Sequence, residues 1–300
     1  MRLAIGSGVL VALAGRGAYA VPLGLPIGVQ LYPLGDDLGK DFDGTLRRVA
    51  EIGYTVVELP SFYGRKPVDL RRSLDMAGLK CVSGGVFANP MSPGEQSLET
   101  HAAQIFDDFH ALGLTHAVCI MPPLPRRMLG ARPASVEEAF ASFTADDWRE
   151  AGAFLNGAGA EARKVGLQLA YHNHGWEFQP AGGETGYDIL TASTDPSLVQ
   201  FELDCGWVAS QGFDPAIYVR KYSKRIAFLH IKDIARPPQS GERLRTVAVG
   251  KGMIDWAALF KAAQETPLLQ YYVELEPPFD APPVWQLLRE SHDYLQSLKV

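Results

Sequence analysis

Histidines and carboxylates follow several apolar stretches of this chain, at the point where each stretch ends. Imidazole nitrogens and carboxylate oxygens together suit Mn²⁺, Fe²⁺, Co²⁺ or Zn²⁺ better than Ca²⁺, and no cluster of thiols or thioethers accompanies them to favour copper(I). The same residue types also transfer protons. The residues concerned are Glu58, His172, His174, Glu177, Asp204, His230, Lys232, Glu274 and Glu276. They predict a site for one divalent metal ion, with Mn²⁺ as the first choice and Zn²⁺ or Mg²⁺ as alternatives.

Three pairs among these residues have the spacing of two that places side chains on the same face of a strand. The pairs are His172 with His174, His230 with Lys232, and Glu274 with Glu276. Only one member of each pair can lie nearest the centre of a site. We expect the other member to orient a ligand or to contact substrate.

Each of these residues also has a purely structural explanation. A single histidine at a strand end is more often a hydrogen-bonded core group than a ligand. Asp204 could cap the turn that follows it, and Glu58 could pair with Arg65 or Lys66. Lys232 and the adjacent aspartate could form a solvated pair. Several such groups at equivalent positions favour a site over these explanations taken one by one.

Eight stretches of strand length alternate with eight stretches of helical pattern. The expected strands are 27–32, 55–59, 79–86, 117–121, 167–172, 199–204, 226–231 and 270–275. The expected helices are 41–52, 68–77, 98–112, 145–165, 187–192, 215–222, 254–263 and 284–298. This alternation over about 280 residues predicts a single-domain α/β protein, a (β/α)8 TIM barrel over residues 21–300, whose strands all end at one mouth. The turn at 32–35 lacks the GxGxxG glycines of an open dinucleotide-binding sheet.

The first twenty residues have the pattern of a signal peptide. Arg2 precedes an apolar run at 3–14, and Ala18-Tyr19-Ala20 has the small-x-small form of a cleavage site. We expect cleavage after Ala20 and a periplasmic or secreted protein. The run is too short, and too rich in glycine and alanine, to span a bilayer well as a permanent helix, so an uncleaved membrane anchor is the less favoured alternative. After processing, no stable membrane span is expected.

Composition limits the possible partners. The formal charge is -6 at neutral pH, and the 28 basic residues are scattered along the chain, so nucleic acid is not an expected partner. Cys81, Cys119 and Cys205 each lie in an apolar, strand-like stretch and are expected to be free buried thiols. The oligomeric state stays open.

At these residues the chain resembles the xylose-isomerase-like barrel superfamily, which includes sugar isomerases and epimerases, inosose dehydratases and DNA-repair endonucleases. The segments that carry the resemblance are 171–178 (YHNHGWEF), 202–207 (ELDCGW), 229–233 (LHIKD), 249–256 (VGKGMIDW) and 271–274 (YYVE). The family holds one metal with a Glu, Asp, His, Glu set from strands five to eight, which implies Asp204, His230 and Glu274 here. Where many relatives have a strand-five glutamate, this chain has His172. We take His172 as the fourth ligand and Glu177 as the acid/base, although the two roles could be exchanged.

The resemblance implies a sugar isomerase or epimerase of carbohydrate metabolism that transfers a proton through a metal-bound enediolate. The residues expected to be catalytic are Glu177, His174 and Lys232, and those expected to contact the substrate are Trp207, Glu58 and Glu276. One alternative is a lyase or hydrolase that cleaves 3-keto-glycosides by β-elimination, which export to the periplasm favours. Another is a catalytically inactive barrel that binds a sugar or a partner. The acidic charge balance, and too few ligands for a three-metal cluster, exclude a phosphodiester nuclease.

Overall fold

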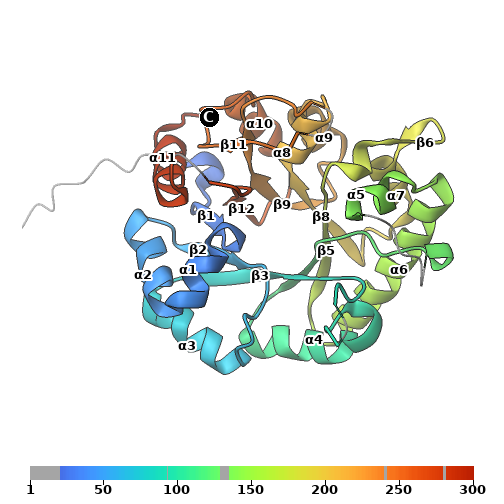
Figure 1. Ribbon diagram of the computed structural model, residues 1–300, viewed down its shortest axis with the longest axis horizontal. Coiled ribbons are helices and arrows are strands. Elements are labelled where there is room, and N and C mark those ends of the chain that lie inside the picture. Colours follow the sequence, from blue (N-terminus) through green and yellow to red (C-terminus); the bar gives the residue numbers. More distant parts are fainter. Residues whose placement is uncertain (1–20, 93, 129–134, 240–241, 280–281) are drawn as a thin grey trace, which may run out of the picture.

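The computed structural model describes residues 21–92, 94–128, 135–239, 242–279 and 282–300. Eight parallel strands form a closed barrel in the order β1-β12-β9-β8-β5-β4-β3-β2 (Figure 1). The strands are β1 (Gly28–Gln30), β2 (Val56–Leu59), β3 (Lys80–Val86), β4 (His116–Cys119), β5 (Gln168–His172), β8 (Val199–Asp204), β9 (Ile226–Ile231) and β12 (Gln270–Val273). Because β1 pairs with both β2 and β12, the first and last strands close the ring.

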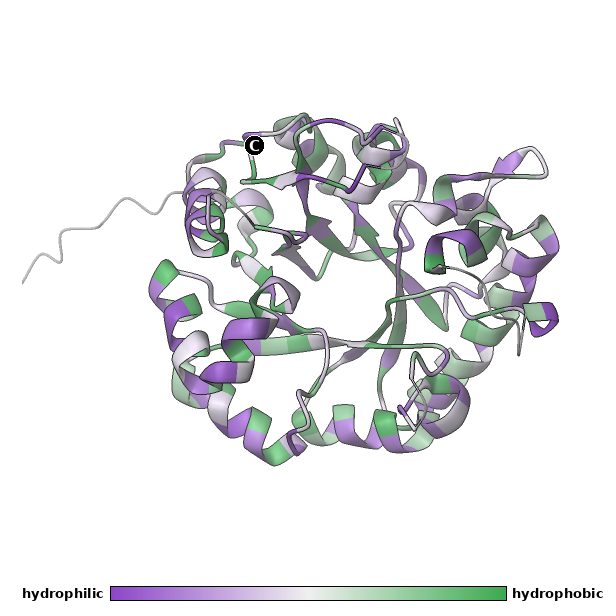
Figure 2. Ribbon diagram, in the orientation of Figure 1, coloured by the Kyte–Doolittle hydropathy of each residue, from purple (hydrophilic) through white to green (hydrophobic). Residues whose placement is uncertain are grey.

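Helices surround the barrel on the outside (Figure 1). They are α1 (Gly35–Lys40), α2 (Phe42–Ile52), α3 (Pro67–Ala77), α4 (Leu98–Leu112), α5 (Val136–Ala141), α6 (Ala145–Lys164), α7 (Gly186–Ser193), α8 (Cys205–Ser210), α9 (Pro215–Lys221), α10 (Trp256–Ala263) and α11 (Val284–Ser297). Figure 2 shows largely hydrophobic strands and helices that carry both hydrophilic and hydrophobic residues. Two antiparallel pairs lie outside the barrel: β6 (Pro180–Ala181) with β7 (Glu184–Thr185), and β10 (Asp233–Ile234) with β11 (Thr246–Val247).

Helix α2 illustrates how the sequence specifies these elements. The Asp41 side chain caps its start by accepting a hydrogen bond from the amide of Gly44. Leu46 and Val49, three residues apart, are both fully buried on the face toward the barrel. The helix ends at Gly53, whose φ of 121° favours glycine. The capping residue, the spacing of the apolar residues and the glycine that ends the helix all lie within residues 41–53.

The interior of the barrel changes in character along its axis. Along β9, the ring of Phe228 packs against the rings of His116 and Tyr272. Two residues further on, His230 contacts carboxylates, and Lys232 follows just beyond the strand. The apolar part fills the interior, and the polar part opens at the carboxyl ends of the strands. This gradient places the candidate site at the mouth.

The predicted (β/α)8 barrel is confirmed. All eight strands occur within a few residues of their expected positions, and Cys81, Cys119 and Cys205 are free and buried. The sequence patterns did not predict the short helices α1, α5 and α8. Within the described residues, no helix has the length and apolar character needed to cross a membrane. The expected signal peptide, residues 1–20, lies outside the described residues.

Candidate metal centre

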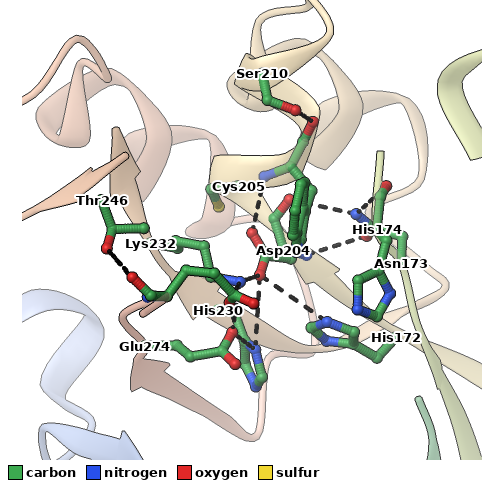
Figure 3. Close-up of polar contacts among 12 residues, drawn as sticks. His172, Asn173, His174, Asp204, Cys205, Ser210, His230, Lys232, Thr246 and Glu274 are labelled. Carbon is green, nitrogen blue, oxygen red and sulfur yellow. Dashed lines mark hydrogen bonds and ion pairs between the residues drawn. The ribbon is translucent and has the colours of Figure 1, made fainter. Parts of the chain in front are cut away.

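Four buried side chains converge at the mouth of the barrel, each from a different strand or strand end. His172, Asp204, His230 and Glu274 each offer a ligand atom, and these atoms lie within 4.8 Å of one another (Figure 3). Nδ1 of His230 is 2.7 Å from Oε2 of Glu274 and 3.8 Å from Oδ2 of Asp204. Nε2 of His172 is 3.9 Å from the same Asp204 oxygen. We call this set of four residues the cradle. It is the set that the sequence predicted as ligands.

Two further carboxylates lie behind the histidines of the cradle. Oε1 of Glu58 is 2.9 Å from Nε2 of His230. Oε2 of Glu202 is 3.0 Å from Nδ1 of His172 and 3.1 Å from Nε2 of His230. When each imidazole donates its rear N–H to one of these oxygens, its front nitrogen presents a lone pair to the cradle. Histidines that bind metals are commonly oriented in this way.

The charges in and around the cradle suit a cation. Two histidines and one lysine face five carboxylates, those of Glu58, Glu202, Asp204, Glu274 and Glu276. Burial, together with repulsion from Glu58, raises the pKa of Glu202 to about 8. Burial also raises the pKa of Asp204 to about 6, although Lys232 lowers it. A divalent cation would offset this buried negative charge, and the mixed nitrogen and oxygen ligands fit such an ion.

Lys232 lies between the cradle and the solvent side of the mouth. Its Nζ is 2.8 Å from Asp204, 2.9 Å from Glu274 and 3.2 Å from Glu276. Burial alone would lower the pKa of this amine, but the three carboxylates raise it well above its usual value. The ammonium group therefore stays charged and can stabilise negative charge on a substrate oxygen.

The interpretation of Lys232 and Asp233 as a solvated pair is wrong. Both side chains are buried, and Asp233 faces away from Lys232 into the loop before α10. Its Oδ2 accepts hydrogen bonds from the amides of Gly250 and Gly252 and from Nε1 of Trp256, at 2.9 to 3.0 Å. Asp233 therefore holds a loop in place next to the site.

A pocket of about 180 Å³ opens over the cradle. Its lining includes six of the residues predicted from the sequence: His172, His174, His230, Lys232, Glu274 and Glu276. Gln30 and Tyr32, which the sequence patterns did not single out, also line it. Burial, together with the charges of Glu276 and Glu274, raises the pKa of the Tyr32 hydroxyl. The pocket therefore combines three residues of the cradle with several groups that can donate or accept a proton.

The ring of His174 lies at one side of this pocket. It stacks on Trp176 at 4.6 Å between centroids and lies 5.5 Å from the ring of Trp207. Burial, reinforced by Lys232, lowers the pKa of His174 to about 3, so the imidazole is neutral near pH 7. Trp207 is half-buried, and its ring lies 5.1 Å from Nζ of Lys232. Trp207 thus walls the site beside Lys232 and His174.

Three residues predicted to contact substrate or transfer protons are not part of the pocket lining: Trp207, Glu58 and Glu177. Glu58 lies behind His230 and accepts a hydrogen bond from the Ser83 hydroxyl, rather than pairing with Arg65 or Lys66. Glu177 is fully buried: its carboxylate accepts hydrogen bonds from the Tyr171 hydroxyl at 2.5 Å and from the amide of His174 at 2.9 Å. Burial raises the pKa of Glu177 to about 7 despite these bonds. Of the two candidates for the strand-five ligand, His172 lies in the cradle and Glu177 does not.

Helix α8 begins directly at the cradle. Oδ1 of Asp204 accepts a hydrogen bond from the amide of Trp207 at 3.0 Å, so this carboxylate caps the helix with one oxygen and faces the cradle with the other. Gly206 lies so close to Lys232 that a Cβ at this position would be 2.8 Å from the Lys232 backbone oxygen. The capping explanation for Asp204 and its place in the cradle are therefore both correct.

Glu202 was missed as a site residue, although a signal for it was present. It precedes Asp204 by two residues on β8, so the alternation of side chains along a strand places both on the same face. Tyr32 gave a weaker signal, because it follows β1 within a short turn rather than ending the strand.

Comparisons with known proteins agree with this geometry. A family model described as xylose isomerase-like TIM barrel matches residues 46–298. An inosose dehydratase of Lacticaseibacillus casei is 28% identical over 247 residues, covering 77% of this chain and 80% of that protein. The crystal structure of a sugar phosphate isomerase/epimerase from Parabacteroides distasonis is 26% identical, with a TM-score of 0.73, and covers 90% of this chain and 97% of that one.

A more distant solved structure shares the fold. The crystal structure of the IOLI protein with a bound zinc atom has a TM-score of 0.65 and 16% identity, covering 91% of this chain and 98% of that one, which shows a shared fold. The zinc belongs to that protein. The match of the family model over most of the length, together with the closed barrel, shows that this chain belongs to the xylose isomerase-like TIM barrel family.

Proposed function

We propose that this protein is a metal-dependent carbon–oxygen lyase that acts on a small sugar or polyol carrying a ketone. The observation that carries the proposal is the arrangement of the mouth: four ligands lie at the base of a pocket whose walls hold His174, Lys232 and Glu276. A divalent metal held by the cradle would polarise the ketone oxygen and so acidify the neighbouring C–H. The family, and curated relatives that are dehydratases, support an enzyme of this kind.

The walls of the pocket can supply the remaining chemistry of an elimination. His174, a neutral imidazole, removes the proton from the carbon beside the ketone. The electron pair of that C–H bond forms a carbon–carbon double bond while the C–O bond on the next carbon breaks. Glu276, whose pKa is raised by burial and by Glu274, donates a proton to the departing oxygen. Lys232 holds negative charge on the substrate oxygen during this step.

Glu177 has a different part in this scheme. Its carboxylate is bonded to the Tyr171 hydroxyl and to the amide of His174, so it fixes the backbone that carries the His174 ring. We assign it a positioning role, with proton transfer by Glu177 as the alternative to be tested.

A sugar isomerase or epimerase is the second candidate. The same proton abstraction serves it, and the similarity to the Parabacteroides distasonis isomerase/epimerase favours it. The two functions differ in the fate of the C–O bond. Incubation of the metal-loaded protein with keto-sugars and 3-keto-glycosides in D₂O distinguishes them.

An elimination produces an unsaturated ketone, seen by ultraviolet absorption and NMR, and releases water or an alcohol. An isomerase instead gives a deuterated isomer that keeps every oxygen. We expect the elimination product, and we expect His174→Asn to lower kcat by about 10²- to 10⁴-fold. Absence of both products with every metal tried would overturn both functions and leave a binding barrel. Export to the periplasm stays a prediction and would bring the protein into contact with glycosides that enter the cell envelope.

A further inference from the structure

A second pocket, of about 270 Å³, lies beside the candidate metal centre. It is formed between the loop after β3, which contains Met91, and the segment after β4, which leads from Met121 through Leu124 into α5. Val136 and Phe140 of α5 form part of its wall. We call it the α5 pocket. The side chains named here are all apolar.

The polar side chains that line the α5 pocket are already bonded within the protein. Nδ2 of Asn89 donates to Glu99, and its Oδ1 accepts from the amide of Leu124. Oγ of Ser135 accepts from the first turn of α5. Among the described residues that line this pocket, none carries a charge. A ligand therefore finds apolar surface here, and the burial of an apolar group is the interaction that the pocket favours.

The α5 pocket borders the pocket over the cradle. Met121 lines both. A series of aromatic rings also connects them: Phe140 lies 4.7 Å from Trp176, which stacks on His174 at 4.6 Å. His174 in turn lines the pocket over the cradle. A molecule with one end above the metal ligands can therefore extend over Met121 toward α5.

The sizes of the two pockets point to a ligand in two parts. Pockets that enclose a drug-sized molecule measure about 300–1,000 Å³. The pocket over the cradle and the α5 pocket each fall below this range, and combined they lie within it. A third pocket, on the β2 side of the mouth, also borders the pocket over the cradle, through Pro60 and Phe87. Its lining includes the charged residues Arg65, Glu95 and Asp108, whereas that of the α5 pocket has no charged residue among those described, so it is less suited to an apolar group.

We propose that the α5 pocket is the subsite for an aromatic aglycone, so that the substrate is a keto-sugar glycoside of a phenol rather than a free sugar. This inference rests on the proposed elimination and names its leaving group. The sugar ring lies over the cradle. The bond that breaks joins the anomeric carbon of the sugar to the aglycone oxygen. That oxygen takes up a proton, and the aglycone departs as a phenol.

Calorimetric titration with two probes tests this subsite. The probes are the methyl and the phenyl glycoside of the same 3-keto-hexose, added to the full-length, Mn²⁺-loaded protein carrying His174→Asn, so that neither probe is cleaved during the titration. We expect the phenyl glycoside to bind about ten- to a hundredfold more tightly, as burial of a ring in an apolar pocket predicts. The readout is the ratio of the two affinities, because a change in the site that affects both glycosides equally leaves this ratio unchanged.

Val136→Asp is the decisive variant. An aspartate in the first turn of a helix is favourable, so α5 keeps its start while a charge enters the pocket. We expect the affinity ratio to fall below about threefold. The matched control, Val136→Leu, keeps the pocket apolar and should keep the ratio. Circular dichroism checks that both variants are folded.

The outcomes separate the subsite from the reaction. Equal affinity of the His174→Asn protein for the two glycosides, or a ratio that stays unchanged when Val136→Asp is added to it, overturns the subsite even if wild type carries out the elimination. If wild type cleaves none of the keto-sugars and 3-keto-glycosides with any metal, the proposed function fails, and binding of phenol alone, measured by NMR and lost in Val136→Asp, would still support the pocket. If Val136→Asp changes the oligomeric state seen by sedimentation but leaves the ratio of the two affinities unchanged, this face binds a second copy of the chain and not an aglycone.

Discussion

Oε1 of Glu58 lies 2.9 Å from Nε2 of His230, although 172 residues separate the two in the sequence. This contact leaves the other nitrogen of His230 facing the cradle. Glu58→Gln replaces an acceptor carboxylate by an amide that can present its N–H₂ to the ring, so the orientation of His230 loses one of its two supporting carboxylates, and Glu202 remains at 3.1 Å. We expect metal affinity to fall about 10- to 100-fold, measured by competition with a chelator. Glu51→Gln, at an exposed position, is the control and should not change it.

Asp204→Asn tests the cradle itself. The asparagine keeps a side-chain oxygen to cap α8, but it removes a charged ligand. Metal in hundredfold excess over its dissociation constant should stabilise the wild-type protein by about 2.7 kcal/mol, a rise in Tm of roughly 5–10 °C. We expect the variant to lose this shift, so that its Tm is the same with and without added metal. A variant that still gains the full shift would contradict the assignment of Asp204 as a ligand.

Glu177→Gln should change how stability depends on pH. Burial raises the pKa of Glu177 to about 7 in the folded protein, whereas its ordinary value is 4.5. The unfolded chain therefore releases this proton first, and the free energy of unfolding falls as the pH rises from about 4.5 to 7. The whole effect is about 3 kcal/mol. Urea denaturation of the metal-saturated protein at pH 5 and pH 8 should show a smaller loss in the variant than in wild type.

The same variant separates the two roles considered for Glu177. If Glu177 only positions His174, the variant should alter kcat by less than about tenfold, because the side-chain oxygen of glutamine can still accept the hydrogen bond from the His174 amide. As a proton-transfer group it should cost about 10²- to 10⁴-fold. A large loss of kcat at unchanged KM, with normal metal binding, would restore Glu177 to catalysis.

Asp233→Asn tests the loop next to the site. The wild-type carboxylate accepts hydrogen bonds from Gly250, Gly252 and Trp256 with one oxygen and from the amide of Ile234 with the other. An asparagine must place an N–H₂ group against one of these sets of donors. We expect the free energy of unfolding to fall by about 3 kcal/mol in urea denaturation. Asp255→Asn caps α10 as well as aspartate does and should cost only a few tenths of a kcal/mol.

Much of the fold and of the cradle was predictable because the signals are local. The alternation of strand and helix predicts the barrel, and the closed barrel brings His172, Asp204, His230 and Glu274 to the same end. What escaped prediction depends on side-chain direction. Glu177 follows the same strand as His172, but its carboxylate turns away to Tyr171, and no sequence pattern records that turn.

Asp204 occupies two structures at once, the cap of α8 and the cradle. Because one carboxylate takes part in both, the stability of α8 and the affinity for a cation are thermodynamically linked. A change in either one changes the other by the same free energy. Any molecule that binds at Trp207 and stabilises α8 then raises the affinity of the protein for the cation by the same factor by which the cation raises the affinity for that molecule. Substrate and metal would in this way raise each other's affinity. The protein would therefore bind its metal more weakly without substrate than with substrate.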